Sequence, residues 1–329
     1  MDAGRYRDVV IDGAYKELFD GFISYKRGIG YRFAQPCQLV IRQLSRFLAG
    51  KPAVPEVITR NYCEEFCILR DNERATTQMS RMTHIRQFCL FLADKGYNCY
   101  VPPAKRIKRP DDFSPYIISE TEMASIIAAA DAKKPIPWLP DCKIVISMLL
   151  RILWCCGLRL SEALFLELND VDIESGALTI RKAKNNKSRI VPMSKTCIEY
   201  ARRYWERMGF DTNRREGLFF PSPRGGRYQS TYIYTQIRKL MLEACVTKDG
   251  VRPCRVHDIR HSFAMRVLEK MDDEGIDVYC NLPLLSAFMG HQDIKSTEYY
   301  LRLTGRGQML IEAAMADAYK GVFPEVGDD

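Results

Sequence analysis

Apolar residues in the first hundred positions recur at intervals of three and four, the spacing that places side chains on one side of a helix. The pattern is clearest over residues 74–95, where six apolar side chains fall on one stripe and the arginines fall elsewhere. A single apolar stripe is typical of a helix that packs against others. The pattern therefore predicts a bundle of four helices, at residues 15–25, 38–48, 57–69 and 74–95.

The periodic pattern stops at residues 103–117, PAKRIKRPDDFSPYI. This segment holds three prolines and a cluster of four basic residues, a composition that favours a linker over a helix or a strand. We therefore divide the chain into a helical domain at 1–102, a linker at 103–117, a second domain at 118–306 and a tail at 307–329.

The second domain combines helices with one predicted β-hairpin. Ser119 followed by Glu122 is the signature of a helix start, and the helix runs to residue 130. Two runs rich in β-branched residues, 177–182 and 188–193, flank the turn AKNNK. Further helices are predicted at 142–156, 159–167, 196–207, 232–244, 258–271, 283–289, 297–300 and 307–319. The expected fold is mainly α with a small β-hairpin.

Composition narrows the class of protein. The 329 residues are 47% hydrophobic, enough for two packed cores. The most apolar stretch, residues 144–158, is too short to span a bilayer, and the N-terminus lacks the apolar segment of a secretory signal. Twelve cysteines form no CxxC pair, and with four histidines they match no familiar zinc spacing. We expect a cytoplasmic protein with reduced thiols, no membrane association and no metal.

The charge of the chain points to a polyanionic partner. The net charge is +8, but residues 311–329 hold one lysine and five acids. Residues 1–310 therefore carry 48 basic and 36 acidic side chains, a net charge of +12. Such an excess is typical of nucleic-acid-binding proteins, and a basic surface that only keeps the protein in solution is the alternative.

Several polar residues of the second domain lie in apolar surroundings. Arg159, in GLRLSEALFLEL, either binds a ligand or only pairs with Glu162 three positions on. His257 and Arg260, in HDIRH, lie three positions apart on one helix face and can reach one ligand. A further histidine, His291, follows Met-Gly. Arginine and histidine dominate this set, which favours an anionic ligand.

HDIRH also resembles the HExxH helix of zinc proteases, with His257 and His261 four positions apart. The acid at the general-base position is Asp258, one methylene shorter than glutamate, and Arg260 would place a cation beside the metal. We therefore disfavour zinc hydrolysis and expect His261 to be a core residue or one that supports the site from behind.

The order of these motifs resembles that of the tyrosine recombinase family, the phage integrases and Xer-like enzymes. The chain has, in sequence, an arginine in GLRLSE, lysines at a hairpin tip, HDIRH, Gly-His and the pair Tyr299 and Tyr300. The resemblance covers residues 118–302. It implies a catalytic domain preceded by a helical core-binding domain. It also implies a homo-tetramer on double-stranded DNA with specific recombination sites, cut and rejoined through a 3′-phosphotyrosine.

The resemblance also assigns roles to individual residues. By position these are Arg159 and Arg260 for the scissile phosphate, His257 and His291 for the family's two histidines, Tyr300 for the nucleophile and Glu162 for a supporting acid. Tyr299 is the rival nucleophile, and the spacing from the Gly-His motif favours Tyr300.

The lysines are assigned in the same way. The family's hairpin lysine stands in a Gly-Lys-Gly turn, whereas this chain reads RKAKNNK, in which Lys184 matches best. Lys182 and Lys187 are the alternatives, and we expect them to contact DNA. The basic linker residues are expected to contact phosphates and to make binding salt-dependent, and they are Lys105, Arg106, Lys108 and Arg109.

The residue types suit this chemistry independently of the resemblance. Two guanidiniums can hold a phosphate whose oxygens gain charge in the transition state, without a metal. A phenol with a pKa near 10 needs its proton removed, a task for His257 and the nearby arginines, and a lysine can protonate the leaving oxygen. The chain has no GxxxxGK[ST] loop for ATP. We expect DNA strand transesterification without a cofactor.

Some alternatives stay open. A type IB topoisomerase-like enzyme would relax DNA as a single protomer, and a non-catalytic DNA-binding regulator is expected to have lost a catalytic residue. Extra residues around 272–281 are interpreted as a loop insertion that faces DNA or a neighbouring subunit, with a tolerated surface segment as the alternative. The apolar stripe of the tail helix docks on its own domain or on a neighbouring subunit. The target DNA, and the choice between mobile-element transposition and chromosome resolution, are not encoded in these patterns.

Overall fold

The computed structural model divides the chain into two compact units, Met1–Phe113 and Ser114–Asp329, called here the N-terminal and C-terminal units. It describes residues 15–31, 35–51, 58–71, 73–104, 115–134, 141–181, 188–211, 216–291 and 293–301. Several predictions fall outside the described residues, and they are the linker cations Lys105, Arg106, Lys108 and Arg109, the hairpin lysines Lys182, Lys184 and Lys187, and the tail helix at 307–319.

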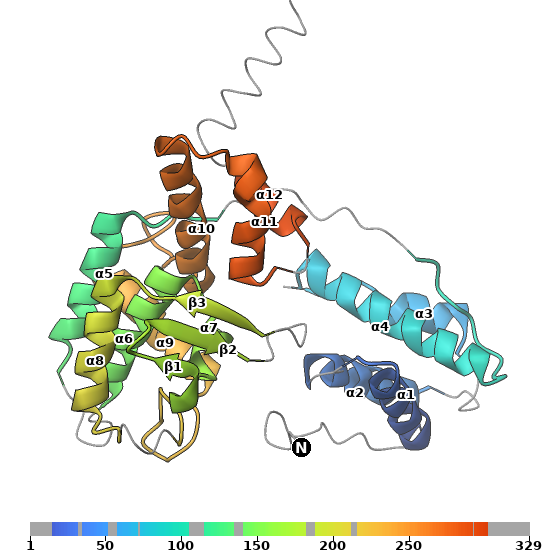
Figure 1. Cartoon of the computed structure of the whole chain (residues 1–329). Coiled ribbons are helices and arrows are strands. Elements are labelled where there is room, and N and C mark those ends of the chain that lie inside the picture. Colours follow the sequence, from blue (N-terminus) through green and yellow to red (C-terminus); the bar gives the residue numbers. More distant parts are fainter. Residues whose placement is uncertain are drawn as a thin grey trace, which may run out of the picture. The chain divides into compact units, whose positions relative to one another are not determined.

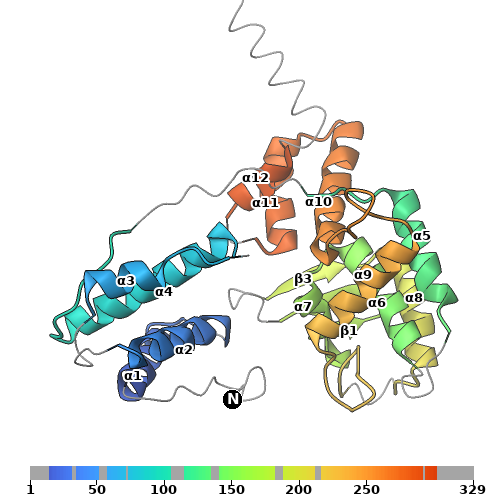
Figure 2. The ribbon, with the colours of Figure 1, turned by 180° about the vertical axis from the view of Figure 1, so that it is seen from behind.

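The N-terminal unit is a bundle of helices, as its apolar periodicity predicts (Figures 1 and 2). Its helices are α1 (Lys16–Gly28), α2 (Gln35–Ala49), α3 (Arg60–Phe66) and α4 (Ala75–Asp94). The core is aromatic, with the rings of Phe19 and Phe88 stacked at 4.2 Å between centroids. Helix α3 is shorter than the predicted 57–69, because Thr59 caps it by accepting a hydrogen bond from the Tyr62 backbone N–H at 3.3 Å.

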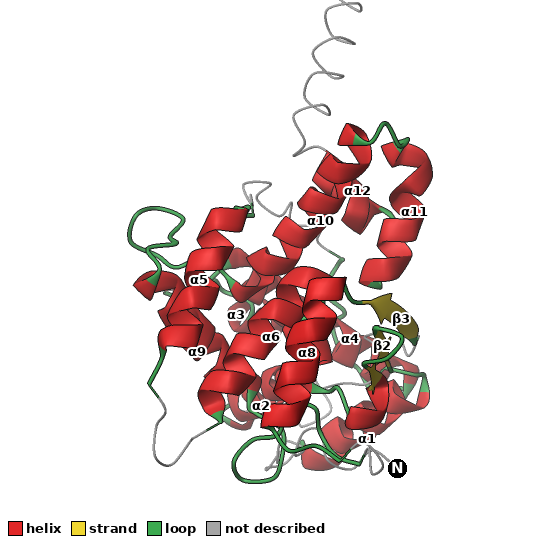
Figure 3. Ribbon diagram, turned by 60° about the vertical axis from the view of Figure 1, so that its left-hand side comes forward, coloured by secondary structure: helices red, strands yellow, loops and turns green. Residues whose placement is uncertain are grey.

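The C-terminal unit is also mainly helical, with a small sheet (Figure 3). Its helices are α5 (Glu120–Ala132), α6 (Cys142–Cys156), α7 (Leu160–Leu164), α8 (Lys195–Arg207), α9 (Ser230–Glu243), α10 (Val256–Asp273), α11 (Val278–Met289) and α12 (Lys295–Leu301). The predicted capping box is present, since Ser119 and Glu122 each accept from the other's backbone N–H. No helix among the described residues is long and apolar enough to cross a membrane.

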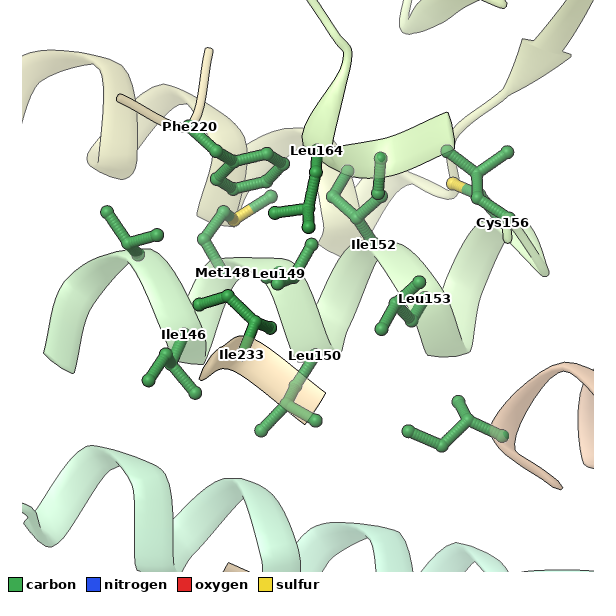
Figure 4. Packing of buried hydrophobic residues seen from close by; sticks show 14 of the residues in the cluster. Ile146, Met148, Leu149, Leu150, Ile152, Leu153, Cys156, Leu164, Phe220 and Ile233 are labelled. Atoms are coloured by element: carbon green, nitrogen blue, oxygen red, sulfur yellow. The ribbon is translucent and has the colours of Figure 1, made fainter. Parts of the chain in front are cut away.

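Helix α6 is the centre of this unit, because it buries side chains on nearly every side. Figure 4 shows apolar residues of α6 on different faces of the helix, among them Met148 near Phe220 and Leu150 near Ile233. The helix ends at Gly157, whose φ of 59° is left-handed. A Cβ there would lie 2.3 Å from a ring carbon of Phe263, so the position requires glycine.

The sheet has three antiparallel strands in the order β1 (Val171–Asp172), β2 (Ala177–Ile180) and β3 (Arg189–Pro192). The predicted hairpin is β2 and β3, whose register pairs Ile180 with Arg189. Strand β1 has only two residues and follows a short 3₁₀ helix, η1 (Leu168–Asp170), so no alternating pattern marks it. The predicted fold class, mainly α with a small antiparallel sheet, is confirmed.

Helices α10, α11 and α12 pack together at one end of the unit, and α11 also contacts β3 (Figure 1). The expected loop insertion at 272–281 is wrong in its form, because α10 continues to Asp273 and α11 starts at Val278. Asp277 causes the early start, since its carboxylate accepts a hydrogen bond from the Cys280 backbone N–H at 3.0 Å. Pro283, where the sequence suggested a helix start, lies inside α11.

Candidate active site

Arg159 lies at the N-cap of α7, two residues after the Gly157 turn. Its Nη1 donates to Glu162 Oε1 at 2.7 Å, and its Nη2 donates to the Gly290 carbonyl at 2.9 Å. The Arg159 side chain remains 22% exposed. The predicted alternative, pairing with Glu162, therefore exists, but it uses only part of the guanidinium and leaves one side open to solvent.

Arg260 lies on α10 and is 2% exposed. Its Nη1 donates to the Gly157 carbonyl at 2.7 Å and its Nη2 to the Met289 carbonyl, while Glu162 Oε2 lies 3.8 Å from Nη1. Burial and the charge of Arg159 lower the pKa of Arg260 to about 9, so the guanidinium is still a cation at neutral pH. Arg159 and Arg260 thus converge on the two helix ends at 157 and 289–290.

A third arginine, Arg189 at the start of β3, belongs to the same group. Its Nη1 and Nη2 donate to the two oxygens of Glu162 at 3.2 and 2.8 Å, and its Nε donates to the Phe288 carbonyl at 2.7 Å. Burial raises the pKa of Glu162, but Arg189 and Arg159 outweigh it and hold that pKa at about 2. Arg159, Arg189 and Arg260 around Glu162, called here the arginine cluster, carry a net charge of +2.

The sequence analysis did not assign Arg189 to the site. The sequence held one signal, since Val191 is apolar and residues two apart on a strand share a face. In the structure Val191 is fully buried. A guanidinium on the buried face of a strand needs an ion-pair partner. The partner, Glu162, is 27 residues away in the sequence, so helix and strand periodicity contain no trace of the contact.

The Gly290 turn joins the arginine cluster to the next histidine. Gly290 ends α11 with φ 65°, and a Cβ there would lie 2.8 Å from Arg189 Nη1. His291 follows, and its Nδ1 lies 2.7 Å from the hydroxyl of Thr297 on α12. Burial, Arg260 and Arg159 lower the pKa of His291 to about 4, so the ring is neutral at pH 7.

Tyr300, on α12, is 3% exposed and lies among histidine rings. Its Oη is 2.7 Å from Nδ1 of His261, and the His291 ring stacks on it at 6.3 Å with an interplanar angle of 18°. Burial raises the pKa of Tyr300 to about 12, whereas the charges of Arg260 and Arg159 act in the opposite direction. The cations of the cluster are therefore close enough to offset part of the effect of burial, and the phenol stays protonated at neutral pH.

His257 contacts the ring of His261 edge-on at 4.8 Å and is exposed to solvent on its outer side. Desolvation of its inner side and the charges of Arg260 and Arg159 lower the pKa of His257 to about 4. The expectation that His261 is a core or supporting residue missed its direct contact with the phenol. Among the described residues, no group of three or more His, Cys, Asp or Glu could hold a metal.

The structure thus brings six of the predicted residues into one site, and they are Arg159, Glu162, His257, Arg260, His291 and Tyr300. It adds Arg189 and His261. Tyr299 is half-buried, with its ring 6.2 Å from that of Tyr300. The hairpin lysines lie outside the described residues.

An arginine cluster and a tyrosine surrounded by histidines, on a mainly helical unit, define a tyrosine recombinase, and comparison with known proteins gives the family. The model of the phage integrase family matches residues 117–306, more than half of the chain. The chain therefore belongs to the phage integrase family and is a tyrosine-type site-specific recombinase, which acts by DNA strand transesterification. The predicted family is confirmed, and the topoisomerase-like and non-catalytic alternatives are not favoured.

Individual relatives extend the match beyond this domain. An integrase/recombinase of Sinorhizobium fredii, y4rE, is 30% identical over 311 residues, which are 91% of this chain and 94% of that protein. Tyrosine recombinase XerD of Proteus mirabilis is 25% identical over 299 residues, 89% of this chain and 88% of XerD.

Solved structures share the fold at low identity. XerH bound to its difH substrate is 18% identical with a TM-score of 0.62, over 92% of this chain and 83% of XerH. The Tn1549 transposon integrase in complex with transposon right-end DNA is 14% identical with a TM-score of 0.63, over 91% and 99%. A lambda integrase tetramer bound to a Holliday junction is 14% identical with a TM-score of 0.61, over 86% and 76%. At these identities the likeness concerns the fold alone.

Proposed function

We propose that this recombinase cuts DNA by attack of Tyr300 on a phosphate held by Arg159 and Arg260, and that it rejoins the strands from a 3′-phosphotyrosine. One observation carries the proposal: Arg260 donates to the Met289 carbonyl and Arg159 to the Gly290 carbonyl, and the next residue, His291, stacks its ring on Tyr300. The proposed phosphate-binding groups and the proposed nucleophile therefore all contact the segment of residues 289–291.

The arginine cluster has the charge that this role needs. A phosphodiester brings one negative charge, and the attack adds negative charge to its non-bridging oxygens. Arg159 meets solvent with part of its guanidinium, and His257 is exposed beside it, so the phosphate has an open side to approach. Forked N–H donors can bind two oxygens at once, which a lysine ammonium cannot do.

We assign the remaining groups as follows. Glu162 holds Arg159 and Arg189 in place, because its carboxylate is ionised at any pH near neutrality. His257 and His291 border the phosphate site. Lys184, which lies in the sequence between β2 and β3, protonates the leaving 5′ oxygen, with Lys182 and Lys187 as neighbouring DNA contacts. No step in this scheme requires a metal, ATP or another cofactor.

We further propose that the substrate is double-stranded DNA with specific recombination sites, that four copies act together, and that this takes place in the cytoplasm. XerH bound to difH, the Tn1549 integrase on transposon-end DNA and the lambda integrase tetramer on a Holliday junction support the proposal by analogy of fold. The linker cations Lys105, Arg106, Lys108 and Arg109 would supply phosphate contacts that weaken as salt rises. The domain division at 102, 117 and 306 is retained as part of this proposal.

The test is a covalent trapping assay. Nicked duplexes tiled across the DNA that flanks the protein's own gene are incubated with the protein in EDTA, and protein–DNA adducts are resolved on denaturing gels. We expect an adduct on a small set of fragments with the wild-type protein and with Tyr299→Phe, and none with Tyr300→Phe. An adduct that persists in Tyr300→Phe and disappears in Tyr299→Phe would move the nucleophile by one residue, and none on any fragment would contradict cleavage at these sites.

A further inference from the structure

Among the described residues, the proposed nucleophile Tyr300 has one side-chain hydrogen-bond partner. The Oη of Tyr300 lies 2.7 Å from Nδ1 of His261, a short and well-placed hydrogen bond. The two residues come from α10 and α12, which pack against each other. His261 directly follows Arg260 in the chain, so the same turn of α10 supplies a phosphate-binding group and the partner of the phenol.

The other two histidines are arranged differently. His291 faces Tyr300 with its ring plane, and its Nδ1 pairs with the Thr297 hydroxyl at 2.7 Å. His257 touches His261 edge-on, and no hydrogen bond joins it to Tyr300 within the described residues. Of the three rings, His261 is therefore the one positioned to exchange a proton with the phenolic oxygen.

The surroundings of His261 keep its ring neutral before DNA binds. The titratable and charged groups that face it are His257 and Arg260 from α10, Arg255 at the N-cap of that helix, His291 from the turn after α11 and Tyr300 from α12. Burial and these positive or ionisable neighbours lower the pKa of His261 to about 3. A neutral imidazole can accept the phenolic hydrogen bond, and the arrival of a phosphate anion reduces the electrostatic cost of protonating it.

We propose that His261 is a catalytic residue: it accepts the hydrogen bond of Tyr300 in the resting site and takes the phenolic proton as Tyr300 attacks phosphorus. The Oη–H bond breaks and an Nδ1–H bond forms, while the Oη–P bond forms and the bond from phosphorus to the 5′ oxygen breaks. The leaving oxygen receives its proton from Lys184, and religation returns the first proton to Tyr300. This inference rests on the proposed function of Tyr300 and Lys184.

Two substitutions separate proton transfer from simple positioning. His261→Asn places an amide oxygen near the position of Nδ1, where it can accept the hydrogen bond but cannot take the proton. His261→Ala removes both abilities. We expect the single-turnover rate of adduct formation, measured on a nicked fragment that the wild type cleaves, to fall about a hundredfold or more in both variants. DNA affinity and the circular dichroism spectrum should stay at wild-type values.

The pH profile and a more acidic phenol give readouts that a packing role would not change. Without His261 the proton must leave to solvent, so the rate should rise about tenfold per pH unit between pH 6 and 9, more steeply than in the wild type. Replacement of Tyr300 by a difluorotyrosine, whose phenol ionises more readily, should restore most of the rate to His261→Asn. Arg159→Lys carrying the same fluorinated residue is the matched control and should stay slow.

Each outcome decides the inference. A wild-type rate in His261→Asn would overturn the proton-transfer role and leave only a hydrogen-bonding one. A slow His261→Asn with an unchanged pH profile and no rescue by difluorotyrosine would overturn the inference in favour of packing. If His261→Ala does not fold, His261→Gln and His261→Asn supply the same comparison. An adduct in Tyr300→Phe would instead show that the proposed nucleophile is wrong, a result that is distinct from these.

Discussion

Both units of the chain bury an arginine, and the two arginines are used differently. In the N-terminal unit Arg81 is 1% exposed and donates from Nε and Nη2 to the two oxygens of Glu73 and from Nη1 and Nη2 to the carbonyls of Phe66 and Ile68. Four of its five N–H groups therefore have acceptors. In the C-terminal unit Arg260 is 2% exposed, and among the residues that the structure describes two carbonyls accept hydrogen bonds from it.

The net charge around the two buried arginines also differs. Arg81 and Glu73 form a neutral pair, whereas the arginine cluster sets three guanidiniums against the single carboxylate of Glu162. A buried cation with unused donors and an uncompensated charge is costly to the fold unless a ligand completes it. We therefore interpret Arg81 as an arginine that holds the fold and Arg260 as one that binds a ligand.

The largest expected effect is on the chemistry of the arginine cluster. Arg159→Lys keeps the positive charge but loses the forked donors, so adduct formation should slow by about 100- to 1,000-fold while the fold is retained. Single-turnover trapping measures the rate, and thermal denaturation measures stability. Normal cleavage by Arg159→Lys would mean that only the positive charge is needed. The number of N–H donors would then not distinguish a ligand-binding arginine from a structural one.

Arg81→Met is the opposite case. It leaves the carboxylate of Glu73, which is 10% exposed, without its partner, and this should lower the free energy of unfolding of the N-terminal unit by about 3 kcal/mol. Far-UV circular dichroism in urea detects the change. All three tryptophans, Trp138, Trp154 and Trp205, belong to the C-terminal unit, so tryptophan fluorescence should unfold at the wild-type urea concentration. A stable Arg81→Met with slow cleavage would contradict the structural role.

The sequence could predict the features that leave a local pattern, and it could not predict contacts between distant segments. Apolar periodicity predicted α6 with both ends correct and α8 to within one residue, because each buries a stripe of its own side chains. Motif order located Arg159, His257, Arg260, His291 and Tyr300. The strand β1 was missed because two residues make no pattern, and hydrogen bonds between distant segments, Glu162 to Arg189 and His261 to Tyr300, leave no local periodicity.

Arg189 lies between Arg81 and Arg260 in the number of its N–H groups that have acceptors. Three of its five N–H groups donate to Glu162 and to the Phe288 carbonyl. Arg189→Leu should lower the free energy of unfolding by about 2 kcal/mol, since it removes charged hydrogen bonds, and cleavage should slow by roughly tenfold because Arg159 still pairs with Glu162. Tryptophan fluorescence in urea and the trapping assay measure the two effects.

Gly290→Ala checks the geometry behind this prediction. The added Cβ would lie 2.8 Å from Arg189 Nη1, so the alanine should destabilise the wild-type protein more than it destabilises Arg189→Leu, in which the clash is absent. Part of the cost should remain in both backgrounds, because φ is 65° at this position. Equal costs in the two backgrounds would show that Arg189 does not occupy this space.

The smallest expected effect is the pH dependence of stability, which should differ between the units. His261 and His291 have pKa values of about 3 and about 4, below the usual histidine pKa of about 6.5, so the unfolded chain binds more protons than the folded one between those values. Their contribution is complete above pH 6.5 and is lost as the pH falls towards 4. We expect about 1 kcal/mol for each, less than the full shift because both keep some contact with solvent.

The N-terminal unit has one histidine, His84, whose pKa is also lowered by burial, so its stability should fall less steeply over the same range. Urea unfolding at pH 7 and pH 4.5, followed by tryptophan fluorescence for the C-terminal unit and by circular dichroism for both, makes the comparison. The double variant His261→Gln and His291→Gln should weaken the fluorescence-detected dependence, and His84→Gln should not change it. Part of the dependence should remain in the double variant, because the pKa of His257 in the same unit is also lowered to about 4. A C-terminal unit equally stable at both pH values would mean that the fold does not lower the pKa values of these histidines, because the folded and unfolded chains would then bind the same number of protons.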